Sequence, residues 1–231
     1  MNRAKEKLRA GGNVLVFNPN FNTPALVEHA GSLGFDVAFI DCEHGSADFE
    51  RVEDMARAAR AGAMTSILRP WSTDPGLVAR YLDCGVGGIQ FPLVDSADAA
   101  KAAVETVRIA RGSLDETLVA VMIESTQALE RIDSIVAVPG VDAFVIGLAD
   151  LARSLGHPGE NQHPDVQAAV DAIIAACVRA NAVAGYNLHN WEQGPRLREK
   201  GVRWWTLHAR TMLARGSQQV HALLGTAATS R

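Results

Sequence analysis

The chain has 231 residues, and 48% of its side chains are hydrophobic, which is enough to bury the core of one large α/β domain. Its formal net charge is −4 with no run of like charges, so the composition gives no reason to expect nucleic acid or an anionic membrane as a partner. The N-terminal segment lacks the apolar core of a signal peptide, no apolar run approaches the ~20 residues of a membrane span, and the three cysteines are scattered. We therefore expect a soluble, cytoplasmic protein.

Short runs rich in Val, Ile and Phe alternate along the chain with longer amphipathic stretches. Several runs are continuously apolar, as strands buried on both faces of a parallel sheet must be. The predicted strands are Val14–Phe17, Asp36–Asp41, Thr65–Arg69, Gly88–Phe91, Leu118–Ile123, Ala143–Ile146, Ala182–Tyr186 and Trp204–Leu207. The main predicted helices are Ala47–Ala61, Pro75–Cys84, Ala97–Arg111, Ala128–Ala137, Pro164–Ala180 and Arg210–Leu224.

Eight strand–helix repeats predict a (β/α)₈ barrel, the TIM barrel, and no linker divides residues 1–231 into separate domains. A doubly wound open sheet is the structural alternative. The first strand is not followed by a glycine-rich phosphate loop, which argues against that alternative.

Polar residues follow several strands, at the end of a parallel barrel where chemistry takes place. They are Asp41, Glu43 and His44 after the second strand, Arg69 after the third, Glu124 after the fifth and Asp150 after the sixth. The first, seventh and eighth strands end in Asn18–Asn20, Asn187–Asn190 and His208–Arg210. Several charges half-buried at one mouth are costly unless a metal or a ligand compensates for them.

Glu124 and Asp150 follow adjacent strands, so their oxygens can meet around one cation. Hard oxygen ligands favour Mg²⁺ or Mn²⁺, with Co²⁺ as an alternative, and two carboxylates leave positions for a 2-oxo acid. The cation would acidify the C–H next to the keto group, and Arg69 would add positive charge against the oxyanion. His44 is the only nearby residue of a type whose unperturbed pKa suits proton transfer at neutral pH, and the helix start at Gly147–Ala149 could hold the substrate carboxylate.

Each of these residues also has a purely structural interpretation. Asp150 could cap the short helix that begins near Leu151. Arg69 could form a structural ion pair with Glu43 or Asp41, and His44 could be a hydrogen-bonded structural residue.

A Schiff-base mechanism is the chemical alternative to a metal, and it needs a lysine at a strand end. The four lysines of the chain all lie in predicted helices or in the N-terminal segment, which argues against it. They are Lys5, Lys7, Lys101 and Lys200.

The chain also resembles the HpcH/HpaI aldolase and citrate lyase family, within the phosphoenolpyruvate/pyruvate-binding barrels. It looks similar to the metal-dependent 4-hydroxy-2-oxoheptanedioate and 2-keto-3-deoxy sugar acid aldolases of that family. The matching stretches run in unbroken order over about residues 25 to 180. They include Gly34–Asp36, Ile40–His44, Leu68–Trp71, Leu82–Gly85, Phe91–Val94, Ile123–Ser125, Ile146–Leu151, Gly156–Gly159 and His163–Gln167.

The resemblance implies that Glu124 and Asp150 are the metal ligands. It also implies that Arg69 contacts the pyruvate oxygens, that His44 serves as the base, and that Asp83 is the acidic partner of that histidine. The resemblance also implies a homo-oligomer, a trimer or more usually a hexamer built from two trimers, in which subunits exchange their last helix, here residues 210–224. The substrates implied are a small 2-oxo acid and an aldehyde.

Some positions depart from the family pattern. Met122 stands where Gln is usual, Leu148 stands where Pro is usual, and the last two strand ends lack the expected small residues. The main prediction is aldol cleavage or formation next to pyruvate through a metal-stabilised enolate, with oxaloacetate decarboxylation as a close relative. The alternatives are an acyl-CoA lyase of the citrate lyase beta type and a barrel that binds a 2-oxo acid without turning it over.

Overall fold

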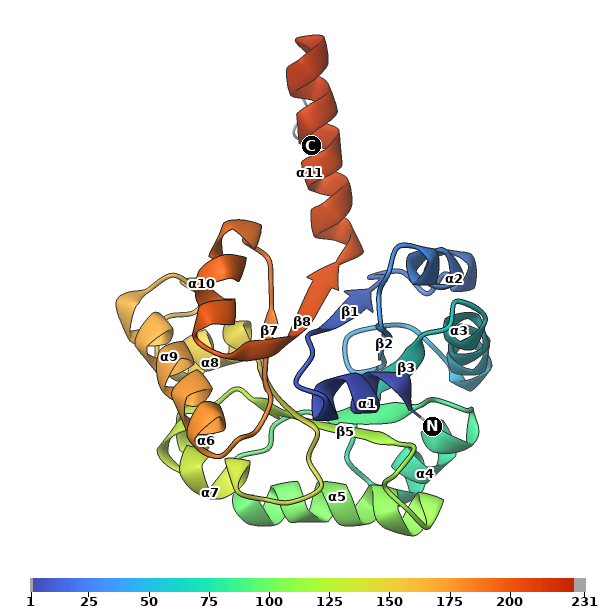
Figure 1. Cartoon of the computed structure of the whole chain (residues 1–231), viewed down its shortest axis with the longest axis vertical. Coiled ribbons are helices and arrows are strands. Elements are labelled where there is room, and N and C mark those ends of the chain that lie inside the picture. Colours follow the sequence, from blue (N-terminus) through green and yellow to red (C-terminus); the bar gives the residue numbers. More distant parts are fainter. Residues whose placement is uncertain (1, 227–231) are drawn as a thin grey trace.

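A closed barrel of eight parallel strands forms the centre of the molecule (Figure 1), in a computed structural model that describes residues 2–226. Each strand pairs with its neighbour in the sequence, and β8 pairs with β1 to close the barrel. The (β/α)₈ prediction is therefore confirmed, and the open sheet is excluded. The strands are β1 Val14–Asn18, β2 Val37–Asp41, β3 Thr65–Arg69, β4 Gly88–Phe91, β5 Leu118–Ile123, β6 Ala143–Ile146, β7 Ala184–Asn187 and β8 Val202–His208.

Helices surround the barrel. They are α1 Arg3–Arg9, α2 Pro24–Ser32, α3 Phe49–Ala61, α4 Pro75–Asp83, α5 Ala97–Arg111, α6 Thr126–Glu130, α7 Ile132–Val136, α8 Leu148–Ser154, α9 Pro164–Arg179, the 3₁₀ helix η1 Trp191–Gln193, α10 Gly194–Glu199 and α11 Ala209–Leu224. Short polar side chains start several of them. Asp48, Asp74 and Ser96 each accept a hydrogen bond from a backbone N–H of the first turn.

The single helix predicted over Ala128–Ala137 is wrong, because two short helices occupy this segment. Ser125 caps the first of them and accepts a hydrogen bond from Ala128 N at 3.0 Å. Arg131 then leaves the helical conformation, with φ −109° and ψ 11°, and its N–H bonds to the carbonyl of Ala128 only three residues back. This interruption turns the chain before α7.

The strands are apolar throughout because both of their faces are buried. One set of side chains, including Val16, Phe39 and Trp204, fills the inside of the barrel. Ile40 and Leu68 belong to the other set, which packs against the helices. Alternate strand residues point to opposite faces, so the residues at the strand ends can be assigned to the inside or the outside of the barrel.

The amino-terminal end of the barrel is closed by α1 and the residue before it. Asn2 Nδ2 donates to the carbonyls of Gly87 and Glu116. Lys5 Nζ donates to the carbonyl of Thr117 at 3.0 Å and to Asp142 at 2.8 Å. The opposite end, where the strands finish, remains open as the mouth of the barrel.

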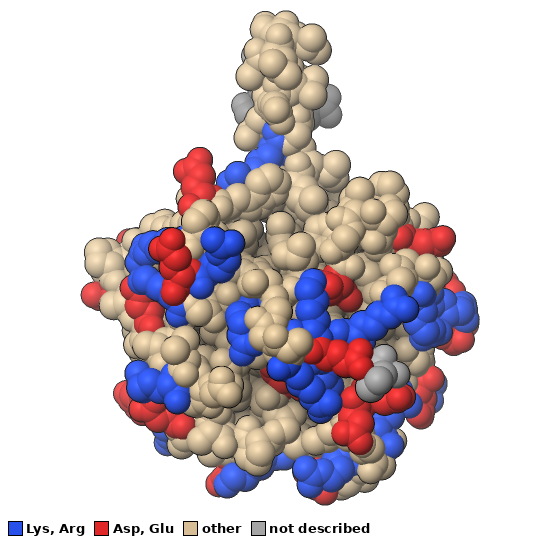
Figure 2. Space-filling view, viewed as in Figure 1, with Lys and Arg blue, Asp and Glu red and all other residues tan. Residues whose placement is uncertain are grey.

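Helix α11 projects away from the barrel instead of packing on it (Figure 1). Only Ala209 of this helix is buried, whereas Leu213, Val220, Leu223 and Leu224 are exposed. Figure 2 shows that the projecting part carries few Lys, Arg, Asp or Glu side chains on the side in view. Within residues 2–226, no helix has both the length and the apolar character needed to cross a membrane.

Candidate functional site

The inward-facing residues at the carboxyl ends of the strands form a polar ring around the mouth. Trp204 lies inside the barrel, so His208, four residues later on the same strand, also faces inward. Val16 likewise lies inside, so Asn18, two residues later, faces inward too. The ring comprises Asn18, Asp41, Arg69, Glu124, Asn187 and His208. The structure therefore brings together Arg69 and Glu124, two of the residues predicted from the sequence.

Arg69 is held by two carboxylates. Its Nη2 and Nε donate to Asp41 at 2.6 and 3.1 Å, and its Nη1 lies 2.8 Å from Glu43 Oε2. Both structural ion pairs considered for this arginine are therefore present. Burial disfavours its charged form, but Asp41, Glu43 and Glu124 outweigh burial and raise the pKa of Arg69. Nη1 also lies 3.8 Å from the sulfur of Met122, the residue that departs from the family pattern.

His44 stands at the rim of the mouth, on a tight turn after β2. Asp41 Oδ1 accepts hydrogen bonds from the backbone N–H groups of Glu43 and His44. A β-carbon on Gly45 would lie 2.0 Å from the Asp41 carbonyl oxygen, so only glycine fits this turn. The His44 side chain is 68% exposed, and its Nε2 lies 3.9 Å from Glu43, so the ring can turn towards a ligand in the mouth.

Glu124 is the most deeply buried of the candidate site carboxylates, with 4% of the residue exposed. Its Oε1 accepts a hydrogen bond of 2.7 Å from the N–H of Leu93, a residue in the left-handed conformation with φ +53°. A leucine in this conformation is strained, and such strain often marks functional sites. Burial, together with Asp150 and Glu43, raises the pKa of Glu124 to about 7, against the opposing effects of Leu93 and Arg69.

The second oxygen of Glu124 faces the chain after β6. A β-carbon on Gly147 would lie 2.2 Å from Glu124 Oε2, so this glycine leaves room for the carboxylate. Asp150 lies in the first turn of α8, which begins at Leu148. Gly147, not Asp150, occupies the capping position, so the capping interpretation of Asp150 is wrong. Asp150 Oδ1 instead pairs with Arg153 at 2.7 Å.

The backbone amides expected to hold the substrate carboxylate are only partly available. The N–H of Gly147 bonds to the carbonyl of Ile123 at 3.1 Å and is used within the barrel. The amides of Leu148 and Ala149 open α8, beside Glu124 and Asp150. They are the remaining candidates for this contact.

Asp83 lies far from the other predicted site residues. It is the last residue of α4, which begins after the carboxyl end of β3 and runs back to the amino end of β4. That end of the barrel is closed by α1, whereas His44 lies at the open mouth. The two residues therefore do not meet within one chain.

The residues around Glu124 fit a divalent cation. Burial, Asp150 and Glu43 raise the pKa of Glu124, an effect that a cation beside this carboxylate would offset, and Gly147 has no β-carbon that would crowd Glu124 Oε2. The pair of Asp150 with the exposed Arg153 is weak, because exposed pairs three residues apart on a helix contribute little. Oxygen donors of this kind suit Mg²⁺ or Mn²⁺.

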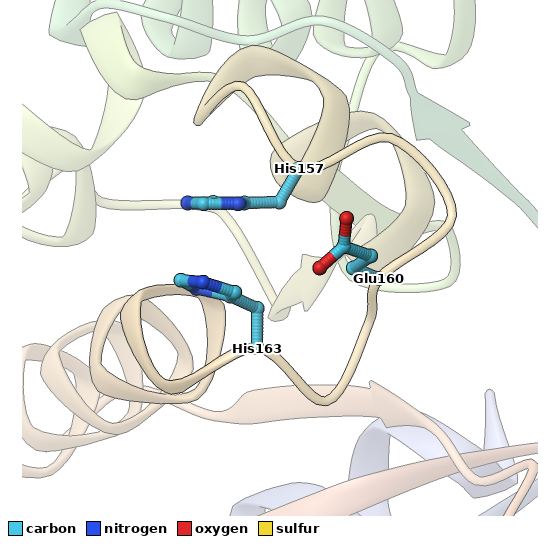
Figure 3. A group of neighbouring side chains, drawn as sticks. All are labelled: His157, Glu160 and His163. Carbon is cyan, nitrogen blue, oxygen red and sulfur yellow. The ribbon is translucent and has the colours of Figure 1, made fainter.

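A second cluster of metal-ligand types lies in the loop between α8 and α9. His157, Glu160 and His163 offer ligand atoms within 4.8 Å of one another (Figure 3). However, the two imidazole rings are stacked, with centroids 3.5 Å apart and planes 17° apart. An imidazole binds a metal through a lone pair in its own plane, so parallel rings cannot share one ion. Contacts with Asp165 explain this cluster better than a metal ion does. The N–H of Asp165 donates to His163 Nδ1, and its carboxylate lies 3.3 Å from His157 Nε2.

Two residues at the mouth that the sequence left without a role are linked to each other. Asn20 Nδ2 lies 3.1 Å from His208 Nδ1, and the rings of His208 and His189 stack with centroids 4.7 Å apart. Burial, with a contribution from His189, lowers the pKa of His208 to about 4. Polar residues at unusual strand ends were the only signal in the sequence for this group.

A model of the HpcH/HpaI aldolase/citrate lyase family matches residues 14–214. The chain belongs to this family. The HpcH/HpaI membership agrees with the closed barrel and with the order of the polar strand ends.

Individual members of the family show the same relationship. A hydroxypyruvate/pyruvate aldolase of Paraburkholderia phytofirmans is 32% identical, over 84% of this chain and 85% of the relative. A 4-hydroxy-2-oxo-heptane-1,7-dioate aldolase of Shigella sonnei is 29% identical over 99% of this chain and 97% of the relative. The crystal structure of a family protein from Burkholderia cenocepacia superposes with a TM-score of 0.90, at 26% identity, over 98% of this chain and 100% of that one.

Proposed function

We propose that the chain is a class II pyruvate aldolase, a carbon–carbon lyase that splits 4-hydroxy-2-oxo acids into pyruvate and an aldehyde and catalyses the reverse addition. The arrangement of Glu124 carries the proposal. This buried carboxylate has one oxygen fixed by Leu93 and the other beside the bare backbone of Gly147, with Asp150 and Arg69 nearby. The names of the aldolase relatives support the same reaction class.

Glu124 and Asp150 would hold Mg²⁺ or Mn²⁺, with Co²⁺ as an alternative. A divalent cation there would polarise the keto oxygen of a bound 2-oxo acid and acidify the neighbouring carbon. Arg69 would face the same oxygen, since Asp41 and Glu43 fix its guanidinium at the mouth. The free amides of α8, on Leu148 and Ala149, would bind the substrate carboxylate.

The cleavage step follows from these positions. His44 takes the proton of the C4 hydroxyl, the electron pair of the C3–C4 bond moves between C3 and C2, and the aldehyde departs. Negative charge then develops on the former keto oxygen, where Arg69 stabilises it. A proton returned to C3 completes pyruvate. His44 suits the first transfer because an imidazole nitrogen can accept a proton and this exposed ring lines the cavity at the mouth.

We also propose that the working form is a homo-oligomer, a trimer or a hexamer, in which α11 packs on another subunit. The exposed apolar residues of α11 support this proposal, because such a surface is rarely left open to water. The position of Asp83 supports it too, since a contact with His44 would need a second chain. The three cysteines are free thiols, in keeping with a reducing cytoplasm as the proposed location.

The thioester-lyase alternative finds less support. It would need a basic patch near the mouth for the nucleotide of coenzyme A, to which Arg153 and Arg210 could contribute. Arg153 pairs with Asp150, and the guanidinium of Arg210 lies 5.4 Å from the ring of Phe21.

The test is proton NMR of pyruvate in heavy water, with added Mg²⁺ or Mn²⁺ and again with a chelator. We expect loss of the methyl signal only with the metal, because exchange at C3 requires the enolate. Glu124→Gln should abolish this exchange, and His44→Ala should abolish aldol turnover while pyruvate and metal still bind. Folded protein that shows no exchange with either metal would contradict the proposal. Metal-independent exchange would contradict the assigned role of Glu124.

A further inference from the structure

A cavity of about 570 Å³ opens between the ends of β1 and β2 and the start of α11. Its wall includes Asn18, Asn20, Asn22, Asp41, His44 and Arg210. The candidate base His44 and Asp41, the partner of Arg69, lie on this wall. In the proposed reaction this is therefore the space beside the bond that breaks, where the aldehyde part of the substrate would lie.

Asn20 is the fixed point of this wall. It has the left-handed conformation, with φ +58°, which asparagine tolerates better than most residues. Its Oδ1 accepts a hydrogen bond of 3.0 Å from the backbone N–H of Arg210. That bond determines which way the amide faces, so Nδ2 is the group that donates to His208 Nδ1 at 3.1 Å. The residue is thus tied to both β8 and α11.

Asn20 in turn orients Asn18. The N–H of Asn20 donates to Asn18 Oδ1 at 2.9 Å, so the Nδ2 group of Asn18 must point the other way. Asn18 is 93% buried, since only 7% of its surface is exposed, yet it lines the cavity. Among the described residues, none accepts a hydrogen bond from its Nδ2. Two amide N–H donors are therefore held in a fixed direction without a protein partner.

The surroundings determine which ligand suits these donors. Asn22 differs from Asn18, because its Nδ2 already donates to a protein group, Ser46 Oγ, at 3.3 Å. Asp41 and Arg210 contribute one charge of each sign to the same wall, so the wall has no excess of positive charge that would attract an anionic group beside Asn18. His208 is neutral at pH 7, because burial lowers its pKa, so it adds no positive charge. A neutral oxygen, such as a hydroxyl, is the ligand that fits.

We propose that Asn18 determines specificity for the aldehyde, by donating a hydrogen bond from Nδ2 to a hydroxyl oxygen on the carbon next to the aldehyde group. The favoured acceptors are then 2-hydroxyaldehydes, over alkyl aldehydes of the same length and over aldehydes that carry a carboxylate. This inference rests on the proposed aldolase function and extends it to the substrate class.

The experiment compares kcat/KM for addition of pyruvate to glycolaldehyde and to acetaldehyde, with glyoxylate as the anionic aldehyde. We expect the wild-type chain to favour glycolaldehyde over acetaldehyde by about tenfold, the discrimination typical of one neutral hydrogen bond. Asn18→Leu keeps the shape of the side chain without its donors, and it should remove this preference. Because both aldehydes are measured in the same variant, a general loss of active protein cancels in the ratio.

Asn18→Ala provides a second test in case the leucine variant does not fold, and it too should lose the preference. Asn190→Leu makes the same chemical change outside the cavity, at an exposed position whose Oδ1 accepts a hydrogen bond from Glu192 N, and it should keep the preference. An unchanged ratio in the folded Asn18 variants would overturn the inference, as would a wild-type preference for acetaldehyde or glyoxylate. Failure of the aldolase proposal itself would look different. In that case the methyl protons of pyruvate would not exchange in heavy water, an experiment that needs no aldehyde.

Discussion

Glu124 and Gly147 approach each other so closely that a β-carbon on the glycine would lie 2.2 Å from Glu124 Oε2. The side chain of Glu124, after β5, thus occupies the space that a side chain at position 147, after β6, would fill. Because Leu93 holds the other oxygen of Glu124, the carboxylate cannot shift without losing that hydrogen bond.

Gly147→Ala should therefore weaken metal binding. The added methyl group displaces Glu124 Oε2, and disturbing the support of a ligand typically costs roughly 10–100-fold in affinity. Titration calorimetry with Mn²⁺ measures the change. Gly216→Ala is the control, because a β-carbon there meets no atom within 4 Å, and it should leave the Mn²⁺ affinity unchanged. Equal affinities for the Gly147 variant and the wild type would refute the role of Glu124 as a ligand.

Arg69→Lys should lower kcat for cleavage by at least about 100-fold, the usual effect of removing one group that stabilises an oxyanion. Lysine keeps the positive charge, but it cannot bridge Asp41 and Glu43 in the fixed geometry of the guanidinium. Steady-state kinetics of pyruvate release give the result. Arg57→Lys, in an exposed ion pair on α3, is the matched control. A higher KM with an unchanged kcat would mean that Arg69 binds the ground state and the transition state equally and does not stabilise the oxyanion specifically.

His208 should make the stability of the chain depend on pH. Its pKa is lowered from 6.5 to about 4 in the folded chain, mainly by burial. Between these two values the unfolded chain binds a proton that the folded chain does not, so folding stability falls as the pH drops from 7 towards 4. The loss is about 3 kcal/mol at most, and below pH 4 this histidine adds nothing further.

Melting temperatures of the wild type and of His208→Gln, measured from pH 7 to pH 4, isolate this effect. The wild type should lose stability relative to the variant as the pH falls. His29→Gln, which removes an exposed histidine of α2, should run parallel to the wild type. If melting temperature depended on pH in the same way for His208→Gln and the wild type, the pKa of His208 would not be lowered by folding.

Lys5→Met should destabilise the chain by about 3–5 kcal/mol, the cost of removing one partner of a buried ion pair. The Lys5 side chain is 4% exposed, and without it Asp142, which is 14% exposed, would stay buried without its counter-charge. Lys7→Met, which breaks the exposed pair with Asp36, should cost less than about 1 kcal/mol. Urea denaturation compares the two. Similar losses in both variants would contradict this account of the amino end.

Charges on the apolar stripe of α11 should break up the proposed assembly. Leu213 and Leu224 lie on the same side of the helix, eleven residues apart, and both are exposed within one chain. Changing both to Glu should give a smaller species in size-exclusion chromatography with light scattering. The control places two glutamates off this stripe, at Ala214 and Gln218. An unchanged mass for the Leu213/Leu224 variant would show that α11 is not an interface.

The sequence was most informative where strands end. The continuous apolar runs located all eight strands, because burial on both faces leaves few alternatives. The positions of Asp41, Arg69 and Glu124 at the mouth follow from strand alternation alone. Asp83 shows the limit of the resemblance, since it lies before β4 and so at the closed end. A contact between Asp83 and His44 would have to join two subunits, and the sequence of one chain does not show how two subunits would be arranged.

Other features depend on the direction of single hydrogen bonds, which composition and periodicity do not contain. The support of Glu124 by Leu93 needs a leucine at positive φ, a conformation that its residue type disfavours. The orientation of Asn18 depends on Asn20, whose own orientation depends on the backbone of Arg210, 190 residues later in the chain. Lys5 was set aside as a poor Schiff-base candidate, and its role in closing the barrel appears only in three dimensions.

The position of α11 also determines the order of events during synthesis. The barrel cannot close until β8 has been made, because β8 joins β7 to β1. The 16 residues of α11 follow β8 directly, and a ribosome adds them in about 1–3 seconds. A nascent chain therefore displays its apolar helix only when the barrel is ready to fold. In the proposed assembly, association through α11 thus follows the synthesis of all eight strands, which limits the exposure of this helix to chance contacts.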